Sequence, residues 1–382
     1  MGMASVKPIK VAVVGCGMIS DAYLNTMVNR FRILEVVGCC DRNPSKAERA
    51  AEKYNIKVLS MEEIIADNSI EIVINLTAPT AHYSVVKQLL EAGKHVYTEK
   101  VLASELEEAA ELVRIANEKN LYLGVAPDTF LGASIQTARY VVESGMIGKV
   151  TSFHCALNRD ISLFAEHSPF AVKPGAGIGF DVGIYYITAM LSILGPVTEV
   201  SGITKTLNKE RKHYFIEKLD EPYELQCENL MASTLQFECG AVGSMLFDSN
   251  SILIVPERST LVLFGTNGIM YMSDPNLFGG EVRVILKGNT EPMVIQQSHA
   301  FTGESRGLGV AEMAWSMRKG RVNRANKEMA YHALEILHSI VLSGEKKQHV
   351  ALKSTFSNMP PIPRGYMDSS YFNSQEESGL AY

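Results

Sequence analysis

A short glycine-rich turn is the part of this sequence whose residue types and spacing most clearly suit chemistry on a ligand. The run Gly15-Cys16-Gly17-Met18-Ile19-Ser20 follows a predicted strand and opens a predicted helix. The first glycine permits a tight turn, and the second lets the backbone approach a pyrophosphate, which free N–H groups at the helix start then attract. We therefore predict a dinucleotide site, and its members in this turn are Gly15, Gly17, Met18 and Ile19.

Three residues near the turn bear on which dinucleotide binds. Ser20 replaces a third glycine, and a residue this small still allows the helix to pack closely on the strand. Asp41 ends the second predicted strand, where a carboxylate can accept hydrogen bonds from both adenosine ribose hydroxyls and would repel a 2′-phosphate. This favours NAD(H) over NADP(H). Arg42 keeps NADP(H) open, because an arginine there can stack on adenine or pair with a phosphate.

A second polar turn, Asn75-Leu76-Thr77-Ala78-Pro79, follows another predicted strand, and His82 lies in the helix after it. Loops at the carboxyl ends of parallel strands face the ligand crevice. We therefore count Thr77, Pro79 and His82 among the cofactor-binding residues. A lone histidine at a helix start is equally well explained as a cap or a packing residue.

Lys100, Asp181 and Tyr185 are the other residues whose types suit catalysis. Lys100 ends a predicted strand, where it is either a solvated lysine or a group that reaches a ligand. Asp181 and Tyr185 are four residues apart at a helix start, so they face one side and can reach one ligand group. An N-cap aspartate and a packing aromatic residue would have the same spacing. The spacing alone leaves both interpretations open.

Elements that can position these residues alternate through the first third of the chain. Short β-branched runs and amphipathic segments of helix length follow one another, which is typical of a parallel sheet built from βαβ units. The predicted strands are Lys10-Val14, Leu34-Cys40, Ile72-Leu76, His95-Thr98 and Leu121-Val125, and the predicted helices include Pro44-Tyr54, Ala81-Ala92 and Ser104-Lys119. Right-handed crossovers then give a doubly wound Rossmann domain over residues 1-125.

The pattern changes beyond Pro127, and residues 126-382 are predicted to form a second domain. Helices are expected at Ser134-Ser144, Tyr185-Leu194 and Asn326-Ser343, and alternating strands at Ala232-Glu238, Ala241-Phe247, Ser259-Gly265 and Arg283-Lys287. An irregular tail follows from Ser354. These features indicate an α+β domain with a large, mostly antiparallel sheet and helices on one face, so the fold class of the whole chain is α/β.

Composition excludes several classes of protein. Hydrophobic residues make up 46% of the chain and charged residues 20%, which suits folded cores. The formal net charge of −6 argues against binding to nucleic acid or anionic membranes. The six cysteines form no CxxC pair and no zinc spacing, so we expect no metal site. No signal segment and no apolar run of membrane-spanning length is found, which predicts a cytoplasmic protein.

Together with Glu99-Lys100, these motifs resemble the glucose-fructose oxidoreductase / inositol dehydrogenase (Gfo/Idh/MocA) family of nicotinamide-dependent sugar and polyol oxidoreductases. The resemblance covers nearly the whole chain and is most specific at residues 175–185. The family lysine is followed by a proline, often cis, whereas Val101 follows Lys100 here. Asp181, Gly183 and Tyr185 fit the tyrosine version of the second family signature, as in glucose-fructose oxidoreductase and dimeric dihydrodiol dehydrogenase.

The resemblance implies hydride transfer between nicotinamide and a carbinol carbon of a cyclic sugar or polyol. Lys100 would take the hydroxyl proton, and partial desolvation would lower its basicity toward the working pH. Tyr185 would relay that proton or bind the substrate oxygen, and Asp181 would orient hydroxyls and hold the lysine. Glu99 would belong to the cofactor side of the site.

The substrate is expected to contact further residues, and the chain is expected to associate with copies of itself. The predicted substrate-binding residues are Lys100, Asp128, Asn158, Arg159, His167, Asp181 and Tyr185, of which Asp128 is preferred among the four outside the family signatures because it follows the last strand of the Rossmann domain. A broad sheet covered by helices on one face leaves the other face to be buried, so a homodimer or homotetramer is expected.

Two other functions share this architecture. NAD-dependent glycosidases oxidise the sugar ring transiently and regenerate the cofactor, so they release an aglycone without net NADH. Regulators of the same fold bind a dinucleotide and a partner protein, and they need not keep the lysine, the aspartate and the tyrosine together. Both remain alternatives to the dehydrogenase.

Overall fold

The computed structural model describes residues 7–160, 162, 165, 169–173, 175–214, 216–250, 259–297 and 299–363. These residues form two compact units. Unit 1 contains described residues 7–136, 299–331 and 359–363, and unit 2 contains those of 137–297 and 332–358. Unit 1 thus continues past residue 125 to residue 136 and also includes segments from late in the chain.

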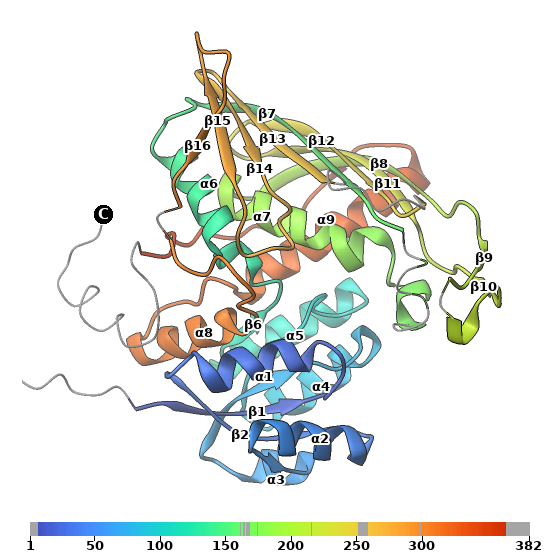
Figure 1. Ribbon diagram of the computed structural model, residues 1–382, viewed down its shortest axis with the longest axis vertical. Coiled ribbons are helices and arrows are strands. Elements are labelled where there is room, and N and C mark those ends of the chain that lie inside the picture. Colours follow the sequence, from blue (N-terminus) through green and yellow to red (C-terminus); the bar gives the residue numbers. More distant parts are fainter. Residues whose placement is uncertain are drawn as a thin grey trace, which may run out of the picture. The chain divides into compact units, whose positions relative to one another are not determined.

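A six-stranded parallel sheet is the centre of unit 1 (Figure 1). Its strands are β1 (Ile9–Val14), β2 (Leu34–Cys40), β3 (Lys57–Val58), β4 (Ile70–Asn75), β5 (His95–Thr98) and β6 (Leu123–Val125). Their order, β3-β2-β1-β4-β5-β6, is the order of a doubly wound Rossmann sheet. The order in which successive strands are added to the sheet reverses between β1 and β4, and the loops after these two strands flank the position where such sheets bind ligands.

Helices of unit 1 lie on both faces of this sheet (Figure 1). They are α1 (Ser20–Asn29), α2 (Pro44–Tyr54), α3 (Met61–Ala66), α4 (Pro79–Glu91), α5 (Leu106–Glu118), α8 (Leu308–Lys319) and the 3-10 turn η1 (Thr129–Leu131). The local sequence explains where two of these helices begin. The Asn43 side chain accepts a hydrogen bond from the Ser45 N–H at the start of α2, and Ser60 and Glu63 form a capping box at the start of α3.

Helix α8 and the chain after it complete unit 1 next to β6. The Val125 N–H donates to the Ala325 carbonyl at 3.0 Å, and Trp315 is buried. Glu312 is fully buried, and its carboxylate pairs with Arg321 at 2.5 Å and with Arg324 at 2.7 Å. These contacts explain why this late segment belongs to the Rossmann unit.

Unit 2 is built on a nine-stranded, mostly antiparallel sheet with the order β16-β15-β14-β13-β7-β12-β11-β8-β17. Only β12 and β7 pair in parallel among the described strands of this sheet. Its strands are β7 (Val150–Asn158), β8 (Val197–Lys205), β11 (Leu230–Phe237), β12 (Val242–Asp248), β13 (Ser259–Gly265), β14 (Gly268–Met272), β15 (Val282–Leu286), β16 (Met293–Ile295) and β17 (Val350–Ala351). This confirms the predicted fold class.

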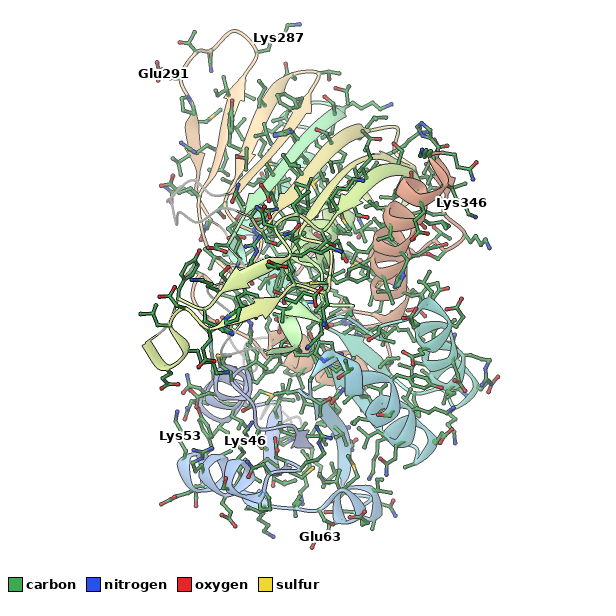
Figure 2. All side chains as sticks on the ribbon, turned by 90° about the vertical axis from the view of Figure 1, so that its right-hand side faces the viewer. Lys46, Lys53, Glu63, Lys287, Glu291 and Lys346 are labelled. Carbon is green, nitrogen blue, oxygen red and sulfur yellow. The ribbon has the colours of Figure 1, made fainter. Side chains whose placement is uncertain are left out.

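Two hairpins extend from the main body of this sheet. β9 (Glu210–Lys212) and β10 (Pro222–Glu224) form a separate two-stranded ribbon, with the 3-10 turn η5 (Ile216–Lys218) between them. The turn that joins β15 to β16 carries Lys287 and Glu291 at the outer tip of the sheet (Figure 2).

Helices cover one face of the large sheet (Figure 1). They are α6 (Ala133–Glu143), α7 (Ile184–Leu194) and α9 (Lys327–Lys346), and the shorter turns η3 (Pro169–Val172) and η4 (Gly179–Gly183) lie before α7. The Tyr186 ring of α7 packs on Phe247 of β12, with ring centroids 5.7 Å apart. Among the described residues, no helix has both the length and the apolar character that a membrane span requires.

Candidate functional site

The glycine turn after β1 has the shape that a dinucleotide needs. Gly15 has a φ of +97°, and a Cβ there would lie 2.7 Å from the Leu76 carbonyl carbon, so only glycine fits. A Cβ on Gly17 would meet nothing within 4 Å, which leaves its backbone open to an approaching phosphate. The buried Ser20 hydroxyl donates to the Gly17 carbonyl at 2.6 Å and closes the turn at the start of α1.

Asp41 lies beside this turn, as its place after β2 predicts. Its Oδ2 accepts the Cys16 N–H at 2.7 Å, and its Oδ1 accepts the Asn43 N–H at 2.8 Å. A carboxylate offers about four lone pairs, so two such bonds leave acceptor sites for ribose hydroxyls. Arg42 is exposed, and so is Met18, while Ile19 is half-buried. The open backbone at Gly17 and the remaining lone pairs of Asp41 therefore suit a dinucleotide.

The loop after β4 is tied to the neighbouring strand β5. Asn75 Oδ1 accepts the Thr77 hydroxyl at 2.7 Å, and Asn75 Nδ2 donates to Thr98 Oγ1 at 3.0 Å. Pro79 is the first residue of α4, where its missing N–H costs nothing. Thr77 and Pro79 are both half-buried at the carboxyl end of the sheet.

His82 has a different environment from the one predicted for a cofactor ligand. It is fully buried, with Nδ1 2.6 Å from the Val101 carbonyl and Nε2 3.0 Å from the Thr77 carbonyl. Burial lowers its pKa, although both carbonyls favour the charged imidazolium. The ring therefore fastens the turn at Lys100 to the loop after β4, and its nitrogens are directed at backbone rather than toward a ligand.

Glu99 and Lys100 follow β5 in a turn held from several directions. Glu99 is buried; its Oε1 accepts the Tyr23 hydroxyl at 2.7 Å and its Oε2 accepts the Lys100 N–H at 3.1 Å. Burial and the Glu99 carboxylate raise the pKa of Tyr23, which keeps the phenol protonated as a donor. The peptide bond between Lys100 and Val101 is cis. Val101 occupies the position where the family that the sequence resembles has proline. Lys100 itself is half-buried.

Asp128, which the sequence predicts as a substrate contact, lies in the interior of unit 1. Only 1% of it is exposed, and its Oδ2 accepts the N–H groups of Gly307 and Gly309, each at 3.0 Å. The carboxyl group therefore caps the first turn of α8 inside unit 1. Burial raises its pKa to about 7, against the opposing effect of these bonds and of Arg306.

Asp181 and Tyr185 lie on a helical segment of unit 2 that begins with a π-helical turn, η4. The caps of η4 and α7 are Ile178 and Gly183, so Asp181 is not the N-cap that its spacing also allowed. A Cβ on Gly183 would lie 2.5 Å from Phe247, which shows that the glycine face packs on the sheet. Asp181 and Tyr185 lie two residues before and two residues after Gly183, which places both near the opposite side of the helical segment. Tyr185 is 8% exposed and Asp181 is half-buried.

The other predicted substrate residues lie near the end of β7. Asn158 is its last residue and is paired in register with Asp248 of β12. The Arg159 N–H donates to the Asp248 carbonyl at 3.0 Å, and both Asn158 and Arg159 are half-buried. His167 lies outside the described residues. No group of three or more His, Cys, Asp or Glu side chains suited to a metal ion occurs in the part of the chain that the structure describes.

Tyr23 is a residue of this region that sequence reasoning did not select. It stands one turn into α1 with an aromatic side chain, which alone indicates only packing. Its partner Glu99 is 76 residues away in the sequence, so no local pattern connects the two. The sole signal was its position in the helix that the glycine turn opens.

Comparisons with known proteins agree with this geometry. The model of an oxidoreductase family with an NAD-binding Rossmann fold matches residues 9–126, and the GFO/IDH/MocA C-terminal domain matches residues 135–271. The chain therefore belongs to the Gfo/Idh/MocA oxidoreductase family, and its first domain is an NAD-binding Rossmann domain.

Individual relatives are more distant. An uncharacterized oxidoreductase of Schizosaccharomyces pombe is 34% identical over 49% of this chain and 52% of its own length. D-Xylose dehydrogenase of Paenarthrobacter nicotinovorans is 26% identical over 43% of this chain and 45% of its own. The match thus spans about half the length of these relatives. The solved structure of levoglucosan dehydrogenase with NADH and levoglucosan has a TM-score of 0.78 at 20% identity, covering 91% of this chain and 100% of that one, and shows the same fold.

Proposed function

We propose that the protein is an NAD(H)-dependent dehydrogenase that transfers a hydride between nicotinamide and a carbinol carbon of a cyclic sugar or polyol. The observation that carries the proposal is the Glu99–Lys100 turn. It follows β5 at the carboxyl end of the NAD-binding sheet and is fixed by Tyr23 and His82. Such fixing suits a catalytic group, because a small misplacement of a base costs much of its rate effect.

Each residue in this proposal has one task. NAD+ supplies the hydride acceptor when it is bound. The Nζ of Lys100 removes the proton of the hydroxyl group that is oxidised. The Glu99 carboxylate holds the lysine backbone by accepting the Lys100 N–H. The Asp181 carboxylate and the Tyr185 hydroxyl bind substrate hydroxyl groups from one helix face.

Asp41 supports NAD(H) in preference to NADP(H). Its carboxylate is held beside the glycine turn by two backbone N–H groups, and these leave acceptor sites for ribose hydroxyls. A 2′-phosphate at the same place would meet a negative charge at close range. Arg42 is exposed and adjacent, so it is the residue through which NADP(H) would gain binding energy if this preference is weak.

A cyclic sugar or polyol is the substrate class that the relatives support. The relatives named D-xylose dehydrogenase and levoglucosan dehydrogenase act, by their names, on D-xylose and levoglucosan. The carboxylate and phenol on the face of Asp181 and Tyr185 match such ligands, because sugar hydroxyls both donate and accept hydrogen bonds.

We also propose that the chain forms a homodimer or homotetramer through the open face of the large sheet. Ile203, Ala232 and Leu246 are neighbours in register on β8, β11 and β12. Ile203 is 58% exposed and Leu246 is 43% exposed, so they form an apolar row on the face away from the helices. Light scattering after size-exclusion chromatography checks this, and Leu246→Lys is expected to shift the mass toward the monomer.

The test of the proposed activity is turnover of NAD+ or NADP+ with a panel of aldoses, inositols and nitrophenyl glycosides. Lasting NADH absorbance is expected with at least one free sugar or polyol, at higher kcat/KM for NAD+ than for NADP+. Nitrophenol release without lasting NADH would instead identify a redox-neutral glycosidase. NADH binding without turnover of any member of the panel would contradict the dehydrogenase and favour the regulator.

A further inference from the structure

Glu228 is an acidic residue of unit 2 that the proposed mechanism does not use, although it lies beside the helical segment of Asp181. It stands just before β11, and its carbonyl accepts the Ile178 N–H at 3.1 Å. This bond attaches the chain at Glu228 to the first turn of the segment that carries Asp181 and Tyr185. The position of the Glu228 backbone is therefore coupled to that of the site helix.

The side chain of Glu228 lies directly on Gly177. A Cβ at Gly177 would be 1.8 Å from Glu228 Oε1 and 2.5 Å from its Oε2, so the carboxyl group occupies the space that any other residue at 177 would fill. A side chain at 177 would therefore have to displace the carboxyl group of Glu228.

Gly177 directly precedes the helical segment that carries the two predicted substrate ligands. The Asp181 N–H donates to the Gly177 carbonyl at 2.9 Å, which places the two residues one turn apart. The carboxyl group of Glu228 lies against Gly177, so it is beside the start of the segment that carries Asp181 and Tyr185.

Cys227 is next to Glu228 in the sequence, and the charges of both carboxyl groups act on its thiol. Burial raises the pKa of its thiol to about 12, and the charges of both Glu228 and Asp181 add to the rise. Both carboxyl groups are therefore close enough to act on the same sulfur atom.

The hydrogen bonding of Glu228 is incomplete. Among the described residues, its Oε1 is buried and has no hydrogen-bond partner. Burial also raises the pKa of Glu228, more than its own backbone N–H lowers it. A buried acceptor without a donor is costly, and folded proteins retain one mainly where a ligand or water completes it.

We propose that Glu228 is a further substrate ligand, which accepts a hydrogen bond from a second hydroxyl group of the polyol bound by Asp181 and Tyr185. The inference rests on the proposed function and narrows the substrate class. A ligand that Asp181, Tyr185 and Glu228 bind together carries hydroxyl groups on adjacent carbons. It has no charged group on those carbons. A carboxylate or phosphate there would face two acidic side chains and would be rejected.

The experiment compares wild type with Glu228→Gln, Glu228→Ala and Gly177→Ala on the best substrate of the panel. In Glu228→Gln the side chain keeps its shape and one oxygen acceptor but loses its charge. In Gly177→Ala residue 228 is still glutamate, but the new methyl group displaces its carboxyl group. We expect KM for the neutral polyol to rise about tenfold in Glu228→Ala, with kcat within about threefold. Gly177→Ala should reproduce the rise in KM, and Glu228→Gln should accept the matching sugar acid better than wild type does.

Glu224→Gln is the matched control, because Glu224 is an exposed carboxylate on β10 four residues earlier. It should leave KM unchanged. A purely structural role for Glu228 would lower Tm in Glu228→Ala without a selective effect on KM. That result, or an unchanged KM in Glu228→Ala, would overturn the inference.

A second readout separates this inference from the proposed function. The rise in Tm that the same polyols cause in the presence of NADH measures binding and does not require turnover. If wild type turns over nothing but polyols raise its Tm and not that of Glu228→Ala, the activity is wrong and the ligand role stands. If polyols stabilise both proteins equally, the ligand role is wrong. Absence of both turnover and stabilisation overturns both.

Discussion

The hydroxyl group of Tyr23 donates a hydrogen bond of 2.7 Å to Glu99, and the other oxygen of Glu99 accepts the N–H of Lys100. Tyr23 is part of α1, the helix that the glycine turn opens, and Glu99 follows β5. One buried carboxyl group thus connects the pyrophosphate end of the dinucleotide site with the proposed catalytic lysine. All three residues belong to unit 1, so the connection is internal to the Rossmann domain.

Tyr23→Phe removes this connection and leaves the ring in place. We expect the free energy of unfolding to fall by about 1–3 kcal/mol, because a buried carboxyl oxygen loses its donor. We also expect kcat to fall by about tenfold, since the turn that carries Lys100 is less well fixed. Urea denaturation and steady-state kinetics measure the two effects.

Tyr54→Phe is the control for this substitution. Tyr54 also donates to a carboxylate, Asp21, at 2.6 Å, but this bond is at the surface. Its loss should change stability by no more than about 0.5 kcal/mol and leave kcat unchanged. Equal effects of the two substitutions would mean that burial of the Tyr23–Glu99 bond has no special importance.

The raised pKa of Asp128 makes the free energy of unfolding depend on pH, and the direction of this dependence can be predicted. Its pKa in the folded protein is about 7, above the ordinary value of 3.8, so the folded state binds the proton more tightly. Its contribution to stability is therefore largest at low pH and is lost as the pH rises through about 7. Asp128→Asn cannot titrate, while its amide oxygen still accepts the two glycine N–H groups.

Urea denaturation of wild type and Asp128→Asn across this range checks the sign. Between pH values of about 4 and 7, wild type should lose stability relative to the variant by about 1 kcal/mol for each pH unit. Above that window the difference should be constant. A difference that grows in favour of wild type with rising pH would contradict the raised pKa.

Asp41→Asn tests the basis of cofactor preference. The amide keeps an oxygen acceptor but removes the charge that repels a 2′-phosphate, so the ratio of kcat/KM for NADP+ to that for NAD+ should rise by about tenfold. Glu48→Gln removes an exposed charge from the neighbouring helix α2 and should leave this ratio unchanged. An equal change in both variants would assign the effect to overall charge rather than to the ribose site.

Strong local signals made parts of the fold predictable. The bounds of β2 and α2 are those expected from the sequence, because a β-branched run ends at Cys40 and Asn43-Pro44 is a clear helix start. The glycine turn and Asp41 were predictable for the same reason, since each follows directly from its own strand.

Helix α8 was not predicted, and its surroundings explain why. Its residues from Leu308 to Ser316 are all buried, so the sequence lacks the amphipathic period that marks a surface helix. Its cap comes from Asp128, 179 residues earlier in the chain. The same kind of distant contact gave His82 and Asp128 their structural roles, which no local pattern could distinguish from ligand binding.

The most direct test of the account is Lys100→Met, measured by turnover and by NADH fluorescence titration on the same preparation. The substitution keeps an unbranched side chain one atom shorter and removes its only ionisable atom. We expect kcat to fall by about 10²- to 10⁴-fold while the Kd for NADH changes by less than about threefold. A variant that binds NADH and oxidises the polyol at the wild-type rate would contradict it, because the proton would then leave by another group.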